Sequence, residues 1–357
     1  MRPVRGKRIV SVLAVGGLAL AATACGEAPD ESPGGGATSA APAYAACMVT
    51  DVGGIDDRSF NASAWAGLQA GKQAQGNIDP KYVASTAEAD YEPNLRQYVT
   101  QGCKFILAVG GLMGTATSKV AKETPNQQFA IVDGKVPETN VFPMQFATEQ
   151  AAFLAGYLAA GYSKTGKVGT YGGMPFPTVT IFMDGFKQGA EYYAKEKKKD
   201  VEVVGWDGKN GSFTGGFEAN EAATSTAKQI LDQDVDVILP VGGPIYQGAI
   251  TAIEDSGSDI AMVGVDADLF ETDPSTQDYV MTSILKGMKV STYEAVVAAG
   301  NDEFDFEPYI GTLENDGVGI APFHNFEDKV SGELAGELDE VKAGIIDGSI
   351  KVQSYLG

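Results

Sequence analysis

The stretch Asp51-Val-Gly-Gly-Ile-Asp-Asp-Arg-Ser-Phe-Asn61 joins an apolar run to a helical pattern through a turn rich in glycine and acidic residues. In an open α/β sheet, ligands bind beyond the carboxyl ends of the strands, where glycine lets the backbone turn and helix N-termini leave N–H groups unpaired. The stretch therefore predicts a parallel sheet with one wall of a small-molecule site at a strand end.

The rest of the chain repeats this alternation of apolar runs and helical patterns. We expect strands at 47–54, 105–111, 129–134, 167–173, 201–208, 235–243 and 260–268. We expect helices at 59–75, 148–161, 179–198, 218–231, 246–255, 286–299 and 326–347. Apolar strands bounded by glycine and separated by helices predict the α/β class, with parallel sheets covered on both faces. The chain after residue 43 is longer than one hydrophobic core usually serves, so two lobes are expected.

The N-terminus has the pattern of an export signal. Four basic residues precede the apolar run Ile9 to Ala22, which is too short to span a bilayer comfortably. Its ending, Ala22-Thr-Ala-Cys25, resembles a bacterial lipoprotein signal, so we expect residues 1–24 to be removed and Cys25 to carry lipid. Ordinary signal cleavage is the alternative. Residues 25–43 are rich in Pro, Gly, Ser and Ala and are expected to form a disordered tether.

The charge of the chain argues against nucleic acid as a partner. The sequence has 26 Lys+Arg against 47 Asp+Glu, a formal net charge of −21, whereas nucleic-acid binding relies on basic side chains that neutralise phosphates. The basic run Lys195 to Lys199 falls where a helix should end, and cations complement the helix dipole there.

Cysteine and histidine are scarce. Cys47 and Cys103 each stand at the start of an expected strand, and export would expose them to an oxidising environment, so a disulfide is possible. Two buried free thiols are the alternative. The one histidine, His324, has no Cys or His at ligand spacing, and no metal site or cofactor is predicted.

Five motifs follow one another along the chain: residues 51–61, Gly166-Lys-Val-Gly169 with Gly172-Gly-Met174, Asn210-Gly-Ser-Phe-Thr214, Gly264-Val-Asp-Ala-Asp268 and Thr282-Ser-Ile-Leu-Lys286. In this order they resemble the basic membrane protein family, the nucleoside-binding lipoproteins of ABC importers. The resemblance implies a type I periplasmic-binding fold, in which two Rossmann-like lobes are joined by three crossovers. Carried over, one lobe would comprise residues 44–145 with 268–303, and the other residues 146–267 with 304–357.

The resemblance also implies that a nucleoside binds between the lobes. Phe60 and Phe213 would supply aromatic faces for its base, and Asn61 offers a donor and an acceptor to the base edge. Gly242 and Gly243 would leave room for backbone groups to approach the ligand.

Charged residues would hold the sugar. Asp266, expected as an exposed cleft carboxylate, can accept two hydroxyl protons, and Lys286 can donate to a ribose oxygen while balancing that charge. Asp51 and Asp57 are further candidates.

Each candidate has a structural alternative. Asp51 and Asp57 could instead cap the helix that begins near Ser59, because short acidic side chains accept its free N–H groups. Phe60 would suit a core, and Asp266 at a strand end with Lys286 at a helix start would suit an ion pair. Asp268-Leu269 and Gly215-Gly216 depart from the family pattern and leave the preferred base open.

The sequence thus predicts a membrane-anchored solute receptor without catalytic activity. It would capture a nucleoside, with a purine preferred, outside the cytoplasm and deliver it to an ABC permease. One rival is an exported nucleoside hydrolase that holds a metal ion on Asp51, Asp56 and Asp57. Another is a ligand sensor that signals without transport.

Overall fold

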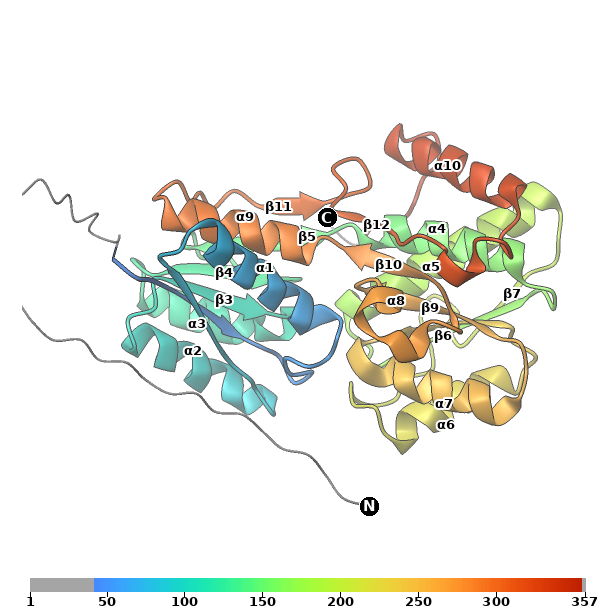
Figure 1. Cartoon of the computed structure of the whole chain (residues 1–357), viewed down its shortest axis with the longest axis horizontal. Helices are drawn as coiled ribbons and strands as arrows, with labels where there is room; N and C mark the ends of the chain where they lie inside the picture. The colour runs from blue at the N-terminus through green and yellow to red at the C-terminus, as the bar shows by residue number, and fades with distance from the viewer. Residues whose placement is uncertain (1–41, 355–357) are drawn as a thin grey trace, which may run out of the picture. The chain divides into compact units, whose positions relative to one another are not determined.

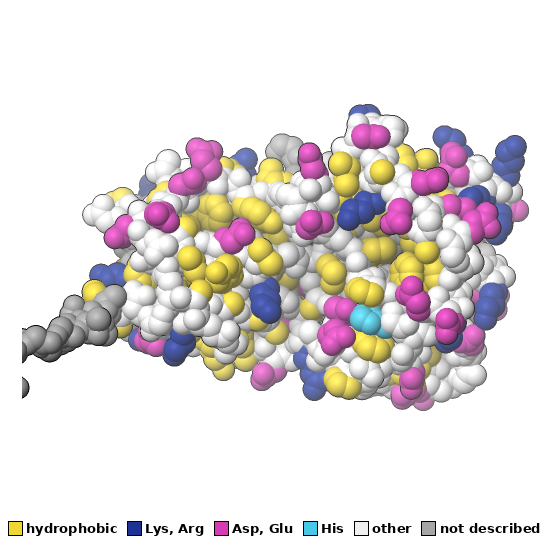
Figure 2. All heavy atoms as spheres, turned by 45° about the horizontal axis from the view of Figure 1, so that its top comes forward, with side chains coloured by type: hydrophobic (Ala, Val, Ile, Leu, Met, Phe, Trp, Pro, Cys, Tyr) yellow, Lys and Arg dark blue, Asp and Glu magenta, His cyan; other side chains and the backbone are white. Residues whose placement is uncertain are grey.

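The computed structural model describes residues 42–354 (Figure 1). The expected signal segment, Cys25 and nearly all of the expected tether lie outside this range. Within it, no helix combines the length and the apolar character needed to cross a membrane. Acidic and basic side chains are interspersed on the face shown in Figure 2, without one large patch of either sign.

The first sheet has six parallel strands in the order β11-β5-β4-β3-β1-β2. They are β1 (Tyr44–Val49), β2 (Ile78–Val83), β3 (Phe105–Val109), β4 (Gln128–Val132), β5 (Val141–Phe146) and β11 (Tyr309–Gly311). Helices α1 (Phe60–Ala74) and α9 (Met288–Gly300) cover one face, and α2 (Tyr91–Thr100) and α3 (Gly114–Glu123) cover the other. Alternate β1 residues enter the two cores, Met48 under α1 and Val49 under α2.

The second sheet has the order β12-β10-β9-β8-β6-β7, with β12 antiparallel. Its strands are β6 (Lys167–Gly172), β7 (Glu202–Val204), β8 (Val237–Val241), β9 (Ala261–Asp266), β10 (Val280–Lys286) and β12 (Val318–Ile320). Its helices are α4 (Thr148–Tyr162), α5 (Pro177–Lys197), α6 (Glu221–Leu231), α7 (Tyr246–Ser256), α8 (Leu269–Thr272) and α10 (Gly332–Ile346). The short 3₁₀ turns are η1 (Glu88–Asp90), η2 (Gly111–Met113), η3 (Gly243–Ile245), η4 (Pro274–Thr276) and η5 (His324–Phe326).

Helices α4 and α5 pack with their backbones in close contact. A Cβ atom on Gly156 of α4 would lie 1.9 Å from the carbonyl oxygen of Phe186, and one on Gly189 of α5 would lie 1.9 Å from that of Phe153. Any larger residue at either position would force the helices apart, because interiors are packed too densely to absorb it.

The chain crosses three times between the two lobes, after β5, after β10 and after β11. The crossing segments are hydrogen bonded to one another: Ala147 N–H donates to Gly311 O at 2.8 Å, and Gly287 N–H donates to Gly317 O at 2.8 Å. This confirms the type I periplasmic-binding architecture that the resemblance implied.

The expected lobe boundaries differ from the structure in two places. Segment 268–303 was assigned to the first lobe, but β10 within it pairs with β9 of the second sheet. Segment 304–357 was assigned to the second lobe, but β11 pairs with β5 of the first. Strand pairing is set by tertiary contacts that the local pattern does not contain, so the pattern did not place these two strands.

Cys47 and Cys103 form a disulfide with their Cα atoms 6.1 Å apart. Cys47 lies in β1, and Cys103 stands just before the neighbouring strand β3. The bond ties the neighbouring strands β1 and β3 of the first sheet together.

Candidate ligand-binding site

A pocket lies where strands of both sheets end, and about 600 Å³ of space there is free of protein atoms, part of it open to solvent. Its walls carry both polar and apolar groups, as small-molecule sites do. The lining residues are Asp51, Gly53, Asp57, Phe60, Asn61, Gly110, Gly111, Leu112, Asp133, Phe176, Thr178, Val179, Phe182, Phe217, Val241, Gly242, Gly243, Asp266 and Lys286. They include every ligand-binding residue predicted from the sequence except Phe213.

The segment between β1 and α1 forms a hydrogen-bonded wall of the pocket. The carboxylate of Asp57 accepts the N–H groups of Ser59 at 3.1 Å, Asn61 at 2.7 Å and Ala62 at 3.0 Å. It therefore caps the first turn of α1, where N–H groups lack helical partners. Asn61 Nδ2 donates to Asp51 Oδ1 at 2.8 Å and to Asp57 Oδ2 at 3.1 Å, so the amide links the two carboxylates. Asp57 therefore both caps α1 and lines the pocket.

Both carboxylates of this wall are buried. Burial raises the pKa of Asp57 to about 6, although the three N–H groups and the amide it accepts oppose that rise. Burial also raises the pKa of Asp51, against the hydrogen bonds from Asn61 and Gly53. Both carboxylates therefore take up a proton at a higher pH than an ordinary aspartate does.

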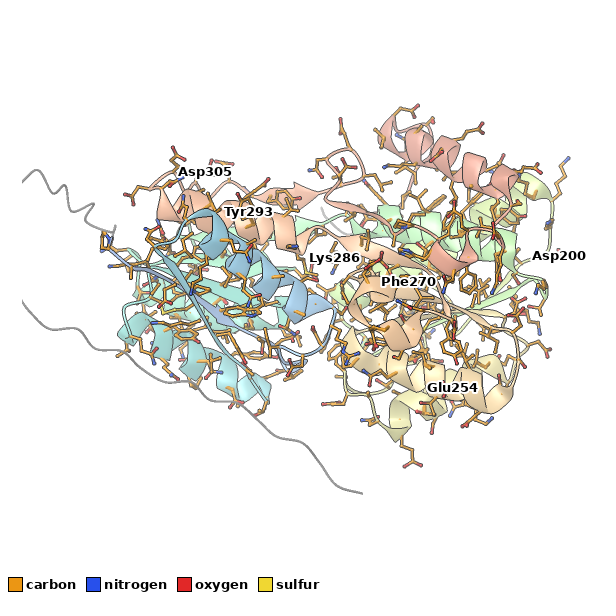
Figure 3. The ribbon with its side chains drawn as sticks, in the orientation of Figure 1. Asp200, Glu254, Phe270, Lys286, Tyr293 and Asp305 are labelled. Atoms are coloured by element: carbon orange, nitrogen blue, oxygen red, sulfur yellow. A yellow bond between two sulfur atoms is a disulfide. The ribbon has the colours of Figure 1, made fainter. Side chains whose placement is uncertain are left out.

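Lys286 joins the two lobes through its ammonium group. Nζ lies 2.5 Å from Asp133 Oδ2, at the end of β4 in the first lobe, and 3.5 Å from Asp266 Oδ1, at the end of β9 in the second. The three side chains are 2%, 8% and 7% exposed. Burial lowers the pKa of Lys286, but Asp133 and Asp266 outweigh it and the net shift is upward, so the lysine stays charged. Figure 3 shows Lys286 at the junction of the lobes.

Two expectations about this ion pair were wrong. Lys286 is the last residue of β10 rather than the start of a helix, since α9 begins at Met288. Asp266 is 6% exposed and is not an exposed cleft carboxylate. Burial raises its pKa to about 6, with Lys286 lowering it and Asp133 and Asp57 adding to the rise. Asp133, which the sequence reasoning missed, lies near the end of an expected strand and is the nearer partner of the lysine.

Aromatic rings face the charged cluster. Lys286 Nζ lies 5.3 Å from the ring centroid of Phe60 and 4.8 Å from that of Phe182, within the range of cation–π attraction. Phe176 and Phe217, both in the second lobe, stack with centroids 6.5 Å apart and an interplanar angle of 30°. The pocket thus has an aromatic ring on its first-lobe side and a stacked pair on its second-lobe side.

Phe213 does not line the pocket. Its ring packs edge-on against Trp206 at 6.1 Å and lies against Gly172, where a Cβ atom would be 3.0 Å from it. Phe217, four positions later in the same loop, lines the pocket instead. Both phenylalanines follow glycine or serine in a loop, and the pattern contains no signal for which ring turns inward.

Glycine is required at two of the strand ends. Gly242 has φ 139°, and a Cβ atom there would lie 2.7 Å from Phe217. Gly110, missed by the sequence reasoning, has φ 120° and its Cβ would lie 3.0 Å from Asp51 Oδ2. Both positions combine a backbone conformation that side chains disfavour with close contact to a pocket residue.

The fold and the pocket define a two-lobed solute-binding protein of the periplasmic-binding type. The chain belongs to the Bmp family, described as "ABC transporter substrate-binding protein PnrA-like", whose model matches residues 45–354. The resemblance seen in the motifs is confirmed by this match. Members of the family are substrate-binding proteins of ABC transporters and not enzymes.

Three known proteins illustrate the relationship. The chain is 29% identical over 360 residues to the CD4+ T-cell-stimulating antigen of Listeria innocua, covering 96% of each chain. It is 29% identical over 326 residues to the ABC transporter nucleoside-binding protein BmpA of Lactococcus lactis, covering 87% of this chain and 89% of that one. A solute-binding protein of an ABC transporter system from Aeropyrum pernix superposes with a TM-score of 0.79 at 25% identity, covering 88% of this chain and 94% of the other.

The alternative of a nucleoside hydrolase needs Asp51, Asp56 and Asp57 together at one metal ion, and the three do not all lie at the pocket. Asp51 and Asp57 line the pocket, whereas Asp56 does not. Across residues 42–354, His, Cys, Asp and Glu side chains form no group of three or more suited to hold a metal ion.

Proposed function

We propose that this protein captures a nucleoside between its lobes and delivers it to an ABC permease. The proposal rests on one arrangement, a buried charged cluster beside aromatic rings from both lobes. A nucleoside combines a flat base with a ribose that carries vicinal hydroxyl groups. The rings suit the base, and the acceptors of the cluster suit the hydroxyls.

Two acceptor atoms support this reading. Asn61 Oδ1 and Asp266 Oδ1 are buried atoms of pocket-lining residues, and within residues 42–354 neither accepts a hydrogen bond; Asp266 Oδ1 has the Lys286 ammonium at 3.5 Å as its ion-pair partner. Buried polar atoms are normally satisfied, so such atoms at a pocket indicate a ligand that supplies donors. Hydroxyl and amino groups of a nucleoside are donors of this kind.

The aromatic rings are the candidates for contact with the base. Phe60 comes from the first lobe, and Phe217 with Phe176 comes from the second, so closure would place a flat ring between them. Phe217 takes the part that the sequence analysis gave to Phe213. Asn61 is the candidate reader of the base edge, and purine is the preferred class.

Phosphorylated nucleotides fit less well. Among the described lining residues, Lys286 is the cation of the pocket, and two carboxylates already neutralise it. A phosphate group placed there would face Asp133 and Asp266. Neutral nucleosides avoid that repulsion.

The remaining parts of the proposal concern location. A lipid on Cys25 would anchor the protein at the outer face of the cell membrane, and the following tether would let the lobes reach a permease. The relative from Lactococcus lactis, named a nucleoside-binding protein of an ABC transporter, supports the same role.

Isothermal titration calorimetry of the purified protein against adenosine, guanosine, inosine, cytidine and uridine tests the proposal. Each mixture is analysed afterwards for free base. Stoichiometric binding of at least one nucleoside without release of base is expected, with the purines tightest. Absence of binding to all five would refute the nucleoside assignment, and release of free base would favour the hydrolase.

A further inference from the structure

A second ion pair joins the lobes outside the pocket. Arg58 Nη1 lies 2.6 Å from Asp273 Oδ1. Arg58 belongs to the segment between β1 and α1 of the first lobe, and Asp273 stands between α8 and η4 of the second. Neither residue is part of the pocket lining. The contact therefore links the lobes without being part of the site that would hold a ligand.

The second lobe holds the Asp273 carboxylate in place by itself. Tyr246 OH donates to Oδ2 at 2.7 Å, and Ser275 donates to Oδ1 from its N–H at 3.1 Å and from its hydroxyl at 2.7 Å. Burial acts to raise the pKa of Asp273, but these donors and Arg58 together hold it below its usual value. The carboxylate is thus a preformed anionic site, to which the first lobe contributes one cation.

Arg58 is placed for this contact by an unusual backbone. Its φ of 54° lies in the left-handed region, which residues with a side chain rarely occupy. Its neighbour Ser59 makes another contact between the lobes, since its hydroxyl donates to Val265 O at 3.0 Å and lies 3.3 Å from Asp266 Oδ2. Asp57 and Phe60, on either side, line the pocket. One short segment therefore carries pocket residues and contacts to the other lobe.

We propose that Arg58 and Asp273 form an interlobe latch that stabilises the closed arrangement of the cleft. Arg58 is a positioning residue: with its ion pair made, the 57–61 segment stays against the second lobe and the cleft stays shut. Hinged lobes open and close about their crossovers, and a contact made in one arrangement shifts the equilibrium toward it. Since neither residue lines the pocket, the latch acts alike on every solute.

The size of the effect follows from the exposure of the two groups. The Arg58 side chain is 50% exposed and that of Asp273 is 3% exposed. Solvent therefore screens the charge of the arginine but has little access to the carboxylate. For such a pair we expect its loss to lower the ratio of closed to open molecules by roughly three- to tenfold. High ionic strength should also lower the ratio of closed to open molecules, because salt screens the ion pair.

Distance measurement by double electron–electron resonance tests the latch. Nitroxide labels are attached to cysteines placed at Lys122 of α3 and Lys228 of α6, one exposed position in each lobe, in a chain with Cys25→Ser. Asp273→Asn removes the charge and keeps the side-chain size, whereas Arg58→Gln removes the charge and shortens the side chain. Each is expected to shift the distance distribution from the closed toward the open population, both without solute and with adenosine added. The double variant should shift it no further than either single variant.

Arg96→Gln is the matched control. Arg96 pairs with Glu123 at 2.7 Å and with Glu92 at 2.9 Å, all within the first lobe, and its loss should leave the distances unchanged. Distributions for Arg58→Gln that coincide with the wild type under both conditions would overturn the latch, as would additive shifts in the double variant.

The experiments can refute the nucleoside proposal without refuting the latch, and the latch without refuting the nucleoside proposal. If none of the five nucleosides binds, the distance comparison without solute still decides the latch. If several bind, Arg58→Gln should weaken all of them by one common factor and speed their dissociation. A change in their order of affinity would show that Arg58 acts on the pocket itself and would contradict the latch.

Discussion

The ammonium group of Lys286 lies 2.5 Å from a carboxylate oxygen of Asp133, although the residues are 153 positions apart and belong to different lobes. Asp266 stands on the other side of the same nitrogen at 3.5 Å. The cation therefore separates two buried anions that would otherwise repel each other. Because each anion comes from one lobe, their common partner lies where the lobes meet.

Replacing Lys286 with methionine should destabilise the protein by about 3–5 kcal/mol at pH 8, because two buried carboxylates lose their cation. The loss should be smaller at pH 5, where protonation can relieve the charge. Denaturant unfolding at both pH values measures it. Lys289→Met, three positions later and exposed, serves as the control and should change little. Equal stability of the Lys286 variant and wild type at pH 8 would contradict the ion-pair account.

Asp266 should contribute to a pH dependence of stability. Its pKa in the folded protein, about 6, is above the ordinary value of 3.8, so folding favours the protonated form. The corresponding stability is fully present below about pH 4 and is lost as pH rises through about 6, an effect of roughly 1–3 kcal/mol. Asp266→Asn should flatten the unfolding free energy between pH 4 and 7, whereas Asp255→Asn on the surface of α7 should not. A slope as steep as that of the wild type would remove Asp266 as its source.

Phe217 and Phe213 should behave differently when changed to alanine. Phe217→Ala removes a ring of the pocket and should weaken nucleoside binding roughly five- to a hundredfold, the range found when a stacked aromatic is lost. Phe213→Ala removes a ring that packs on Trp206 and should lower stability while leaving affinity within about twofold. Calorimetry and thermal unfolding of both variants make the comparison. Loss of affinity in the Phe213 variant alone would reverse the assignment.

The contact between α4 and α5 should tolerate no side chain at Gly156. A Cβ atom there meets the backbone of α5, so Gly156→Ala should destabilise the protein by about 1–3 kcal/mol or more. Gly336 of α10 has no neighbouring atom within 4 Å of a Cβ, and Gly336→Ala should stabilise by about 0.5–1 kcal/mol through the lower flexibility of the unfolded chain. Melting temperatures that move in the same direction would refute this contrast.

The local sequence pattern was sufficient to predict the fold class and many of the residues that line the pocket. Glycine and acidic residues at the ends of apolar runs predicted the turns that follow β1, β8 and β9, and residues such as Asp51, Gly242 and Asp266 line the pocket accordingly. The reason is geometric, since all parallel strands of a sheet end at one edge.

The local sequence pattern did not predict a residue's role where that role depends on a partner distant in the sequence. Asp133 ends an apolar run like many others, and its importance comes from Lys286, which only the meeting of two lobes brings near. Phe213 and Phe217 have the same chemistry and share a loop, and the packing of Trp206 decided between them.

The sequence by itself determined the alternation of strands and helices, the strand-end turns and the family, because these depend on neighbouring residues and on short motifs. The tertiary structure decided which strands pair, which ring enters the pocket, and which charges meet across the lobes. Burial and Coulomb attraction act between atoms that are close in space, and only the folded chain brings residues that are distant in sequence together.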